Sequence, residues 1–225
     1  MGKYSSPARS LILWGMTMTA GLRERKKAAT RQALNEAAVR LAIEHGLDNV
    51  TVEAIAEAAN VSRRTFSNYF ADKEEAVLYT DEVRRRRLHE LVAARPPAEP
   101  AWAALCGAAG QLIAENDEDP DHSAQIRLLR RHPSLLGRMA AGSVESERVL
   151  AGLVVDRIPA SERPPAEDGR PPLDPDLDAR LRARTLAAAL ESALRIATLQ
   201  WLDDPGLSLP RTLHHLLAAA ADPWH

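Results

Sequence analysis

The apolar positions near the start of the chain follow the spacing of an amphipathic helix. Over residues 27–45 they recur at the i, i+3, i+4 and i+7 positions that share one helix face. These positions are Leu34, Ala37, Ala38, Leu41 and Ala42. Gly46 follows, where a helix commonly ends on a left-handed residue. The pattern therefore predicts a helix that ends at His45.

Two shorter helices are predicted next, with a sharp turn between them. Thr51 can cap a helix over 52–59, and Ser62 can cap another that runs through Tyr69, because hydroxyl side chains accept hydrogen bonds from the first free N–H groups of a helix. Asn60 lies between them and is a residue type that tolerates positive φ. Two short helices joined by such a turn form a helix-turn-helix.

The rest of the pattern predicts more helices, with breaks rich in proline. Asp72 and Glu75 have the spacing of a capping box, and the helix that they begin continues until Pro96 and Pro97. Further helices are expected over residues 101–115, 123–131, 134–141, 143–158, 175–202 and 210–221, with a mobile, proline-rich and acidic loop over 159–174. No apolar run approaches the ~20 residues of a membrane span, so no membrane partner is expected.

The composition indicates an all-α protein. Of the 225 residues, 45% are hydrophobic but only 4% aromatic, and 40 are alanine, the strongest helix former. A single cysteine, Cys106, excludes an internal disulfide framework and suits a reducing, cytoplasmic location. The sequence has no CxxC or HExxH spacing, no glycine-rich phosphate loop and no GxSxG motif. We therefore expect no metal site, no cofactor and no enzymatic activity.

Charge divides the chain into two unlike parts. Residues 1–95 carry 16 Lys and Arg against 12 Asp and Glu, a net +4, whereas residues 96–225 carry 13 against 19, a net −6. A basic first part joined to an acidic second part favours a nucleic-acid-binding domain followed by a domain for a ligand or partner. A basic cluster over 23–27 is either an arm that reaches DNA or solvated charge.

The segment from residue 25 to residue 78 resembles the DNA-binding domain of the TetR family of bacterial transcriptional regulators. The signature positions that carry the resemblance are Gly46, Thr51, Ile55, Ala56, Ala59, Asn60, Val61, Ser62, Thr65, Phe66, Tyr69, Phe70 and Lys73, in order and without gaps. Asn60 and Arg64 stand where the family usually has glycine, and Arg64 adds a long cation to the DNA-facing side. The resemblance implies an N-terminal three-helix helix-turn-helix domain followed by a helical ligand-binding and dimerisation domain.

The third helix carries the residues that are expected to read DNA. Because the major groove admits one helix, side chains near the N-terminus of that helix can contact base edges. The candidates are Arg63, Arg64, Thr65, Ser67 and Asn68, of which the arginines suit guanine and the asparagine suits adenine. The resemblance assigns phosphate contacts to Thr51, Tyr69 and Lys73. Phe66 and Phe70 are expected in the small core.

The second half is expected to supply a dimer interface and an effector pocket. One helix-turn-helix reads a short half-site, so we expect a homodimer on a palindromic operator in double-stranded DNA. The resemblance places the dimer contact on the helices over 175–202 and 210–221. The apolar stripe on the first of these is Leu181, Leu186, Leu190, Leu194, Ala197 and Trp201, which an intramolecular core could also use. Candidate pocket residues are Trp102, Leu105, Leu112, Ile126, Arg130, Met139 and Leu194, with a filled core as the alternative.

The sequence thus predicts a transcriptional regulator, a repressor that an unidentified, small and hydrophobic effector releases from DNA. The alternative is a DNA-binding regulator whose second domain is a protein-interaction module without a small-molecule ligand. The expected organisation is a disordered leader over 1–18, a DNA-binding domain over 19–72, a connecting helix over 73–95, and an effector-binding and dimerisation domain over 96–225. The natural start is Met1, Met16 or Met18.

Overall fold

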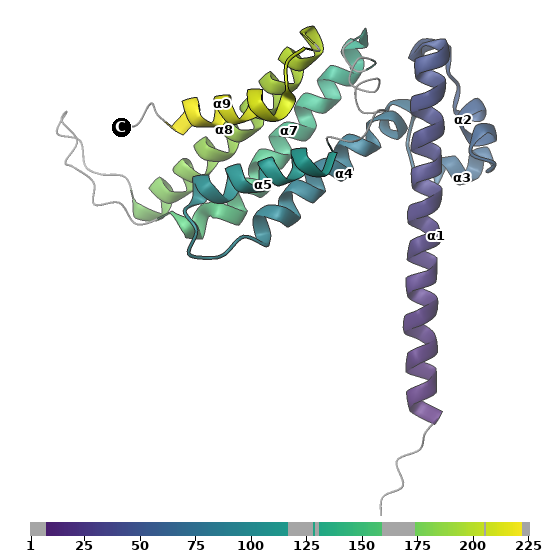
Figure 1. Ribbon diagram of the computed structural model, residues 1–225. Helices are drawn as coiled ribbons and strands as arrows, with labels where there is room; N and C mark the ends of the chain where they lie inside the picture. Colours follow the sequence, from purple (N-terminus) through teal and green to yellow (C-terminus); the bar gives the residue numbers. More distant parts are fainter. Residues whose placement is uncertain (1–7, 117–127, 129–130, 159–173, 205, 222–225) are drawn as a thin grey trace, which may run out of the picture. The chain divides into compact units, whose positions relative to one another are not determined.

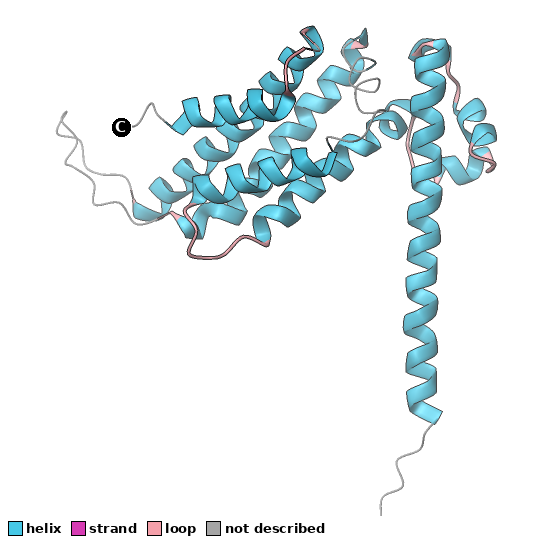
Figure 2. Cartoon of the chain, in the orientation of Figure 1, coloured by secondary structure: helices cyan, strands magenta, loops and turns pink. Residues whose placement is uncertain are grey.

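A computed structural model describes residues 8–116, 128, 131–158, 174–204 and 206–221, with side chains from residue 23 onward except at 116 and 202 (Figure 1). Every regular element in these ranges is a helix, which confirms the all-α prediction (Figure 2). The chain divides into two compact units, Met1–Tyr79 and Thr80–His225. The boundary falls inside helix α4, which runs over Lys73–Ala93.

The first unit is built on one long helix and two short ones. Helix α1 spans Ala8–His45, α2 spans Val52–Ala58 and α3 spans Arg63–Ser67, with a 3-10 turn, η1, over Leu47–Asn49. Helix α1 ends as predicted, because Gly46 takes a positive φ of 81°. It begins earlier than predicted, so residues 8–18 of the expected leader are helical, and residues 1–7 lie outside the described residues. No proline occurs between residues 8 and 45 to interrupt it.

A compact core holds the first unit together. Phe66 and Phe70 are almost fully buried, as predicted, and Phe70 meets the Tyr79 ring edge-on at 5.6 Å between ring centroids. The buried Asn35 side chain donates a hydrogen bond of 2.7 Å to the carbonyl of Ala76, so its polar group is satisfied within the core. These contacts fix α1 against the start of α4.

In the described part of the second unit, four long helices accompany its part of α4. They are α5 (Ala101–Asn116), α7 (Pro133–Val154), α8 (Pro175–Asp203) and α9 (Leu209–Ala221), with a 3-10 turn, η2, over Val155–Arg157. The separate helices predicted over 134–141 and 143–158 are one helix, α7, that continues through Gly142. Most of the helix predicted over 123–131 and residues 159–173 of the predicted loop lie outside the described residues, whereas Asp174 is the N-cap of α8.

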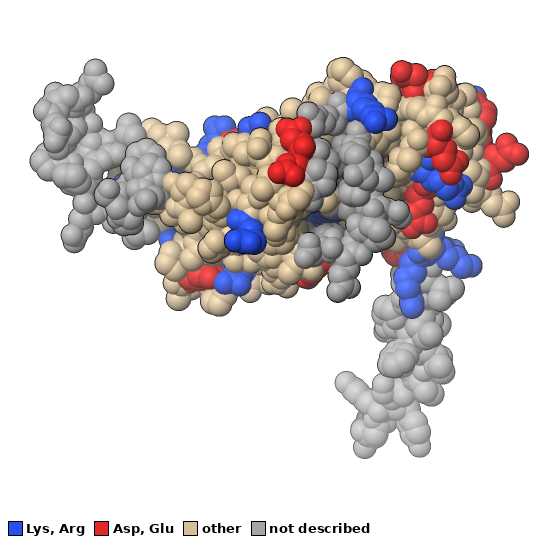
Figure 3. Space-filling view, turned by 45° about the horizontal axis from the view of Figure 1, so that its top comes forward, with Lys and Arg blue, Asp and Glu red and all other residues tan. Residues whose placement is uncertain are grey.

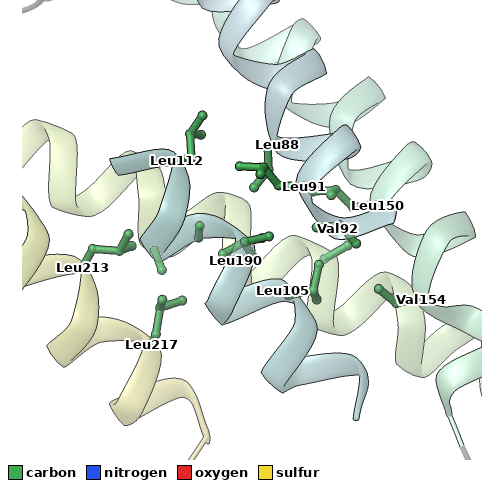
Figure 4. Close-up of a cluster of buried hydrophobic side chains, with 14 of the residues drawn as sticks. Leu88, Leu91, Val92, Leu105, Leu112, Leu150, Val154, Leu190, Leu213 and Leu217 are labelled. Atoms are coloured by element: carbon green, nitrogen blue, oxygen red, sulfur yellow. The ribbon is translucent and has the colours of Figure 1, made fainter. Parts of the chain in front are cut away.

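Leucine and alanine from α4, α5, α7, α8 and α9 fill the core of the second unit (Figure 4). Leu190 and Ala197 from the predicted dimer stripe on α8 are fully buried in it. Leu181 from the same stripe is 45% exposed. The stripe is therefore mainly the core face of α8, the alternative that the sequence left open.

Candidate nucleic-acid interface

Local hydrogen bonds set the geometry that presents α3. The Thr51 side chain accepts from the Ala54 N–H at 3.2 Å, and the Ser62 hydroxyl accepts from the Thr65 N–H at 3.0 Å. Asn60 takes a φ of 54°, which lets the chain reverse within the turn. All three local predictions are confirmed, and they explain why so short a helix as α3 has a defined start.

Helix α3 buries one side and leaves the predicted reading residues on the other. Phe66 is its buried residue. Arg63, Arg64, Ser67 and Asn68 are exposed, while Thr65 is half-buried. Since a side chain must reach solvent to contact a base edge, the four exposed residues meet the first requirement for that role. The structure thus brings the predicted reading residues together on the outer side of α3.

The two arginines of α3 differ in their electrostatic surroundings. Arg63 Nε lies 2.8 Å from Glu53 Oε1, an exposed ion pair between α3 and α2 that the sequence analysis missed. Arg64 forms no ion pair with any residue that the structure describes. The Thr65 hydroxyl is 2.9 Å from that of Ser62, so it also belongs to the N-terminal cap of α3. Arg64 is the more available cation, and Arg63 has to leave or share Glu53 in order to bind DNA.

The predicted phosphate contacts fall into two groups. Thr51 is exposed and Tyr69 is half-buried at the end of the α3 turn. Lys73 instead points into its own unit, where its ammonium donates to the carbonyls of Leu47 at 2.8 Å and Val50 at 3.0 Å. Lys73 therefore holds the turn between α1 and α2, a role that the sequence analysis missed because its partners lie more than twenty residues earlier. Its contact with phosphate stays a prediction.

The structure places the predicted pocket residues of the second unit in different surroundings. Leu105 and Leu112 are buried in the core, Leu194 packs against it, and Met139 is half-buried. Ile126 and Arg130 lie outside the described residues. Trp102 lines a different feature, which the sequence did not predict. This is an apolar groove of about 250 Å³ between α5 and α9, lined also by Cys106, Ile113, Leu213 and Leu217.

A polar cluster lies among the helices of the second unit. Arg85 on α4 pairs with Asp81, and His89 Nε2 lies 2.8 Å from the Ser146 hydroxyl on α7. Burial lowers the pKa of His89, and the nearby Arg85 cation lowers it further. Glu191 on α8 belongs to the same cluster, and burial raises the pKa of its carboxyl, although hydrogen bonds from Ser146 and Ser143 oppose the rise.

Two further features limit the chemistry of the described residues. Burial raises the pKa of the Cys106 thiol to about 11, so the reactive thiolate is disfavoured. Among the residues that the structure describes, no three His, Cys, Asp or Glu side chains lie together as metal ligands would.

None of the described helices combines the length and apolar character that a membrane crossing requires.

Residues 34–79 match a family model described as bacterial regulatory proteins, tetR family. A curated relative, the HTH-type transcriptional regulator TcmR of Streptomyces glaucescens, is 34% identical over 144 residues. That match covers 61% of this chain and 64% of TcmR.

Solved structures share the fold. NalD of Pseudomonas aeruginosa, described as the secondary repressor of the MexAB-OprM multidrug efflux pump, superimposes with a TM-score of 0.54 at 22% identity, over 85% of this chain and 95% of NalD. A TetR-family regulator from Streptomyces coelicolor gives a TM-score of 0.50 at 17% identity, over 84% of this chain and 91% of that one. At these identities the likeness concerns the fold alone.

Proposed function

Because residues 34–79 match the family model of the tetR family of bacterial regulatory proteins, we propose that this protein is a homodimeric transcriptional regulator of the TetR family that binds a palindromic operator. It acts on double-stranded DNA in the cytoplasm and is a regulator rather than an enzyme. Each protomer places one α3 helix in the major groove, and two-fold symmetry aligns the two helices with the two half-sites.

The observation that carries this proposal is the outer side of α3. Its exposed residues combine two cations, Arg63 and Arg64, with two short polar side chains, Ser67 and Asn68. Arginine forms bidentate hydrogen bonds with guanine and asparagine does so with adenine, and each such pair discriminates by about 1–3 kcal/mol. The capped turn before α3 holds these side chains on a fixed scaffold, as sequence reading requires.

An exposed apolar face on α8 supports the homodimer. Leu177, Leu181 and Ile196 are each about two-fifths exposed. At about 100° per residue they fall within roughly one third of the helix circumference, opposite the buried Leu190. Large apolar side chains that share one exposed face are typical of a surface that a partner covers. We assign this face of α8, rather than the stripe around Leu190, to the partner subunit.

The groove between α5 and α9 supports a small, hydrophobic effector. Its lining of Trp102, Ile113, Leu213 and Leu217 is apolar, and its volume of about 250 Å³ is close to the lower limit of ligand pockets, about 300 Å³. An effector would relieve repression if it bound more tightly to a conformation in which the spacing of the two α3 helices no longer matches that of the half-sites. The operator would then be released. Helix α4 is the lever in this proposal, because it contributes residues to both units.

A binding experiment tests the regulator directly. The purified protein is titrated with DNA from immediately upstream of its own gene, and with sites selected from random oligonucleotides, at several salt concentrations. We expect a palindromic site that is bound at least about 10³-fold more tightly than random duplex. Binding that stays weak and independent of sequence after the selection would contradict the proposal.

Arg64→Ala tests the reading role within that assay. We expect it to lose about 1–3 kcal/mol of discrimination at one base pair of each half-site, because a bidentate arginine contact specifies one base. Arg40→Ala is the matched control, since Arg40 is exposed on α1, about 180° around the helix from Arg31. Affinities for operators with single substitutions report both effects. An equal loss on operator and random DNA would exclude base reading by Arg64.

A second candidate, a protein-interaction module in place of an effector domain, is favoured by the packing of Leu105 and Leu112. Both were candidate pocket residues, and both are buried in the core. Thermal unfolding in the presence of a broad panel of hydrophobic metabolites separates the two functions. A ligand that raises the melting temperature and also releases DNA favours the effector domain. If no ligand does so while a protein partner alters DNA binding, the second candidate is correct.

A further inference from the structure

A basic segment of α1 lies upstream of the residues that pack into the first unit. Side chains 23–29 are all exposed, and the nearly fully buried part of the helix begins at Leu34. This segment contains Arg23, Glu24, Arg25, Lys26 and Lys27, which sum to a net charge of +3. Figure 3 shows Lys and Arg side chains gathered on this part of α1. The segment precedes residues 34–79 and is therefore not covered by the family match.

Arg31 orients this segment relative to the candidate interface. Its Nη2 donates to the Tyr69 carbonyl at 3.3 Å, and its guanidinium carbon lies 5.3 Å and 4.9 Å from the ring centroids of Phe70 and Tyr79. The face of α1 that carries Arg31 is therefore turned toward the turn between α3 and α4. Tyr69, a predicted phosphate contact, lies in that turn.

Helical periodicity ranks the four cations of the segment by their angle around the helix from Arg31. At about 100° per residue, Lys27 and Arg23 lie about 40° and 80° around the helix from Arg31, on neighbouring parts of one face. Arg25 and Lys26 lie about 120° and 140° from Arg31, on the far side. Along the helix axis, Lys27 and Arg23 lie about 6 Å and 12 Å from Arg31, toward the N-terminus of α1. Neither Arg23 nor Lys27 forms an ion pair with another described residue.

We propose that Arg23 and Lys27 bind phosphates of the DNA backbone that flank the half-site read by α3. The inference rests on the proposed function and extends the DNA contact beyond the helix-turn-helix. Two long, exposed cations one turn apart, on the face that Arg31 turns toward Tyr69, form a positive stripe that continues from the α3–α4 turn. Such contacts add affinity and register but carry no sequence information. Their signature is a steeper dependence of binding on salt, because each neutralised phosphate releases condensed counterions.

The chain supplies a matched pair of double variants for the test. Arg23→Ala/Lys27→Ala removes the proposed contacts, and Arg25→Ala/Lys26→Ala removes the same two charges from the other side of the helix. Alanine is the strongest helix former, so both variants keep α1 helical, which circular dichroism checks. Binding of the full chain to a random-sequence duplex of about 40 base pairs and to the selected operator is measured over a fourfold range of salt.

The salt slope is the slope of the logarithm of the binding constant against the logarithm of the salt concentration. We expect Arg23→Ala/Lys27→Ala to lower its magnitude by about 1.8, since each phosphate contact contributes about 0.9. The ratio of the wild-type binding constant to that of this variant should then fall about twelvefold between 50 and 200 mM salt. The ratio of operator affinity to random affinity should stay the same. Arg25→Ala/Lys26→Ala should change the slope by less than half as much.

An equal change of slope in the two double variants would assign the effect to general attraction and overturn the proposal. An unchanged slope in Arg23→Ala/Lys27→Ala would overturn it as well. A second measurement trims the operator duplex from its ends. Loss of flanking base pairs should weaken the wild-type chain but not Arg23→Ala/Lys27→Ala. If no specific operator exists, the proposed function fails, whereas the slopes on random duplex still report on the phosphate contacts.

Discussion

At the scale of single residues, polar side chains that reach distant backbone groups hold the first unit together. Lys73 satisfies two carbonyls of the turn between α1 and α2, and Arg31 reaches the carbonyl of Tyr69. In each case one long cation connects segments that are more than twenty residues apart. Lys73, which the sequence analysis assigned to a phosphate contact, therefore also has a structural role.

Lys73→Met tests the structural role of Lys73. The methionine keeps most of the apolar stem but leaves the carbonyls of Leu47 and Val50 without the ammonium donor, at a cost on the order of 1–3 kcal/mol. We expect the free energy of unfolding of the first unit, measured in urea, to fall by about that amount. Lys26→Met is the control at an exposed lysine, and an equal effect in both variants would contradict the structural role of Lys73.

His89 makes stability depend on pH. Because burial and Arg85 lower its pKa in the folded chain, the unfolded chain binds the proton more readily below the ordinary value of about 6.5. The contribution of His89 is therefore complete at neutral pH and is lost as the pH falls below about 6.5. Glu191 acts with the opposite sign, since its raised pKa makes the folded chain bind a proton more readily than the unfolded chain.

We expect His89→Gln to lose less stability than the wild-type chain between pH 7.5 and pH 5.5, because glutamine cannot take up that proton. Urea unfolding at the two pH values measures the difference. His45→Gln, at an exposed histidine on α1, should behave as the wild type does. The same pH dependence in His89→Gln and wild type would show that another group is responsible.

At the scale of elements, the signals that were read correctly from the sequence are local. The caps at Thr51 and Ser62 and the positive φ at Asn60 depend on residues within three positions of each. The sequence analysis ended a helix at Ala141, whereas α7 continues through Gly142. A Cβ at that position would lie 2.7 Å from Cζ of Arg85, so the glycine makes room for a side chain of α4. The structural roles of Lys73 and Arg31 were not predicted, because their partners also lie far away in the sequence.

Gly142→Ala tests this account of α7. Alanine in a helix interior usually stabilises by about 0.5–1 kcal/mol relative to glycine. At Gly142 we expect this gain to be absent, because the new methyl group must displace the Arg85 guanidinium from its ion pair with Asp81. Gly137 has open space around its Cβ position and provides the control. Equal gains in the two variants, measured in urea, would rule out the steric explanation.

At the scale of the whole molecule, α8 has two apolar faces with different uses. Leu190 and its neighbours build the core of the second unit, and Leu177, Leu181 and Ile196 remain exposed. The sequence predicted an apolar stripe on this helix but could not assign it, because core and interface use the same side chains. The burial of the individual side chains distinguishes the two faces. We therefore place the proposed dimer contact on the exposed face.

Leu181→Asp should therefore weaken the proposed homodimer without unfolding the chain. A charge on the proposed interface loses apolar burial and is expected to raise the dimer dissociation constant by at least tenfold, or about 1.4 kcal/mol. Light scattering after size exclusion, over a range of protein concentrations, measures the shift. Val144→Asp is the control, since Val144 is 57% exposed on α7, outside the proposed interface. A dimer that is unaffected by Leu181→Asp would exclude this face.

The position of the boundary between the two units has a consequence for engineering. Because Tyr79 and Thr80 are consecutive residues within α4, no loop separates the two units where a new sensor domain could be joined. A chimeric regulator spliced there must keep the phase of the helix. One inserted residue turns everything downstream by about 100°, whereas seven inserted residues complete almost two turns and leave an offset of only about 20°. Functional fusions at this junction should therefore recur with the period of a helix rather than improve steadily with linker length.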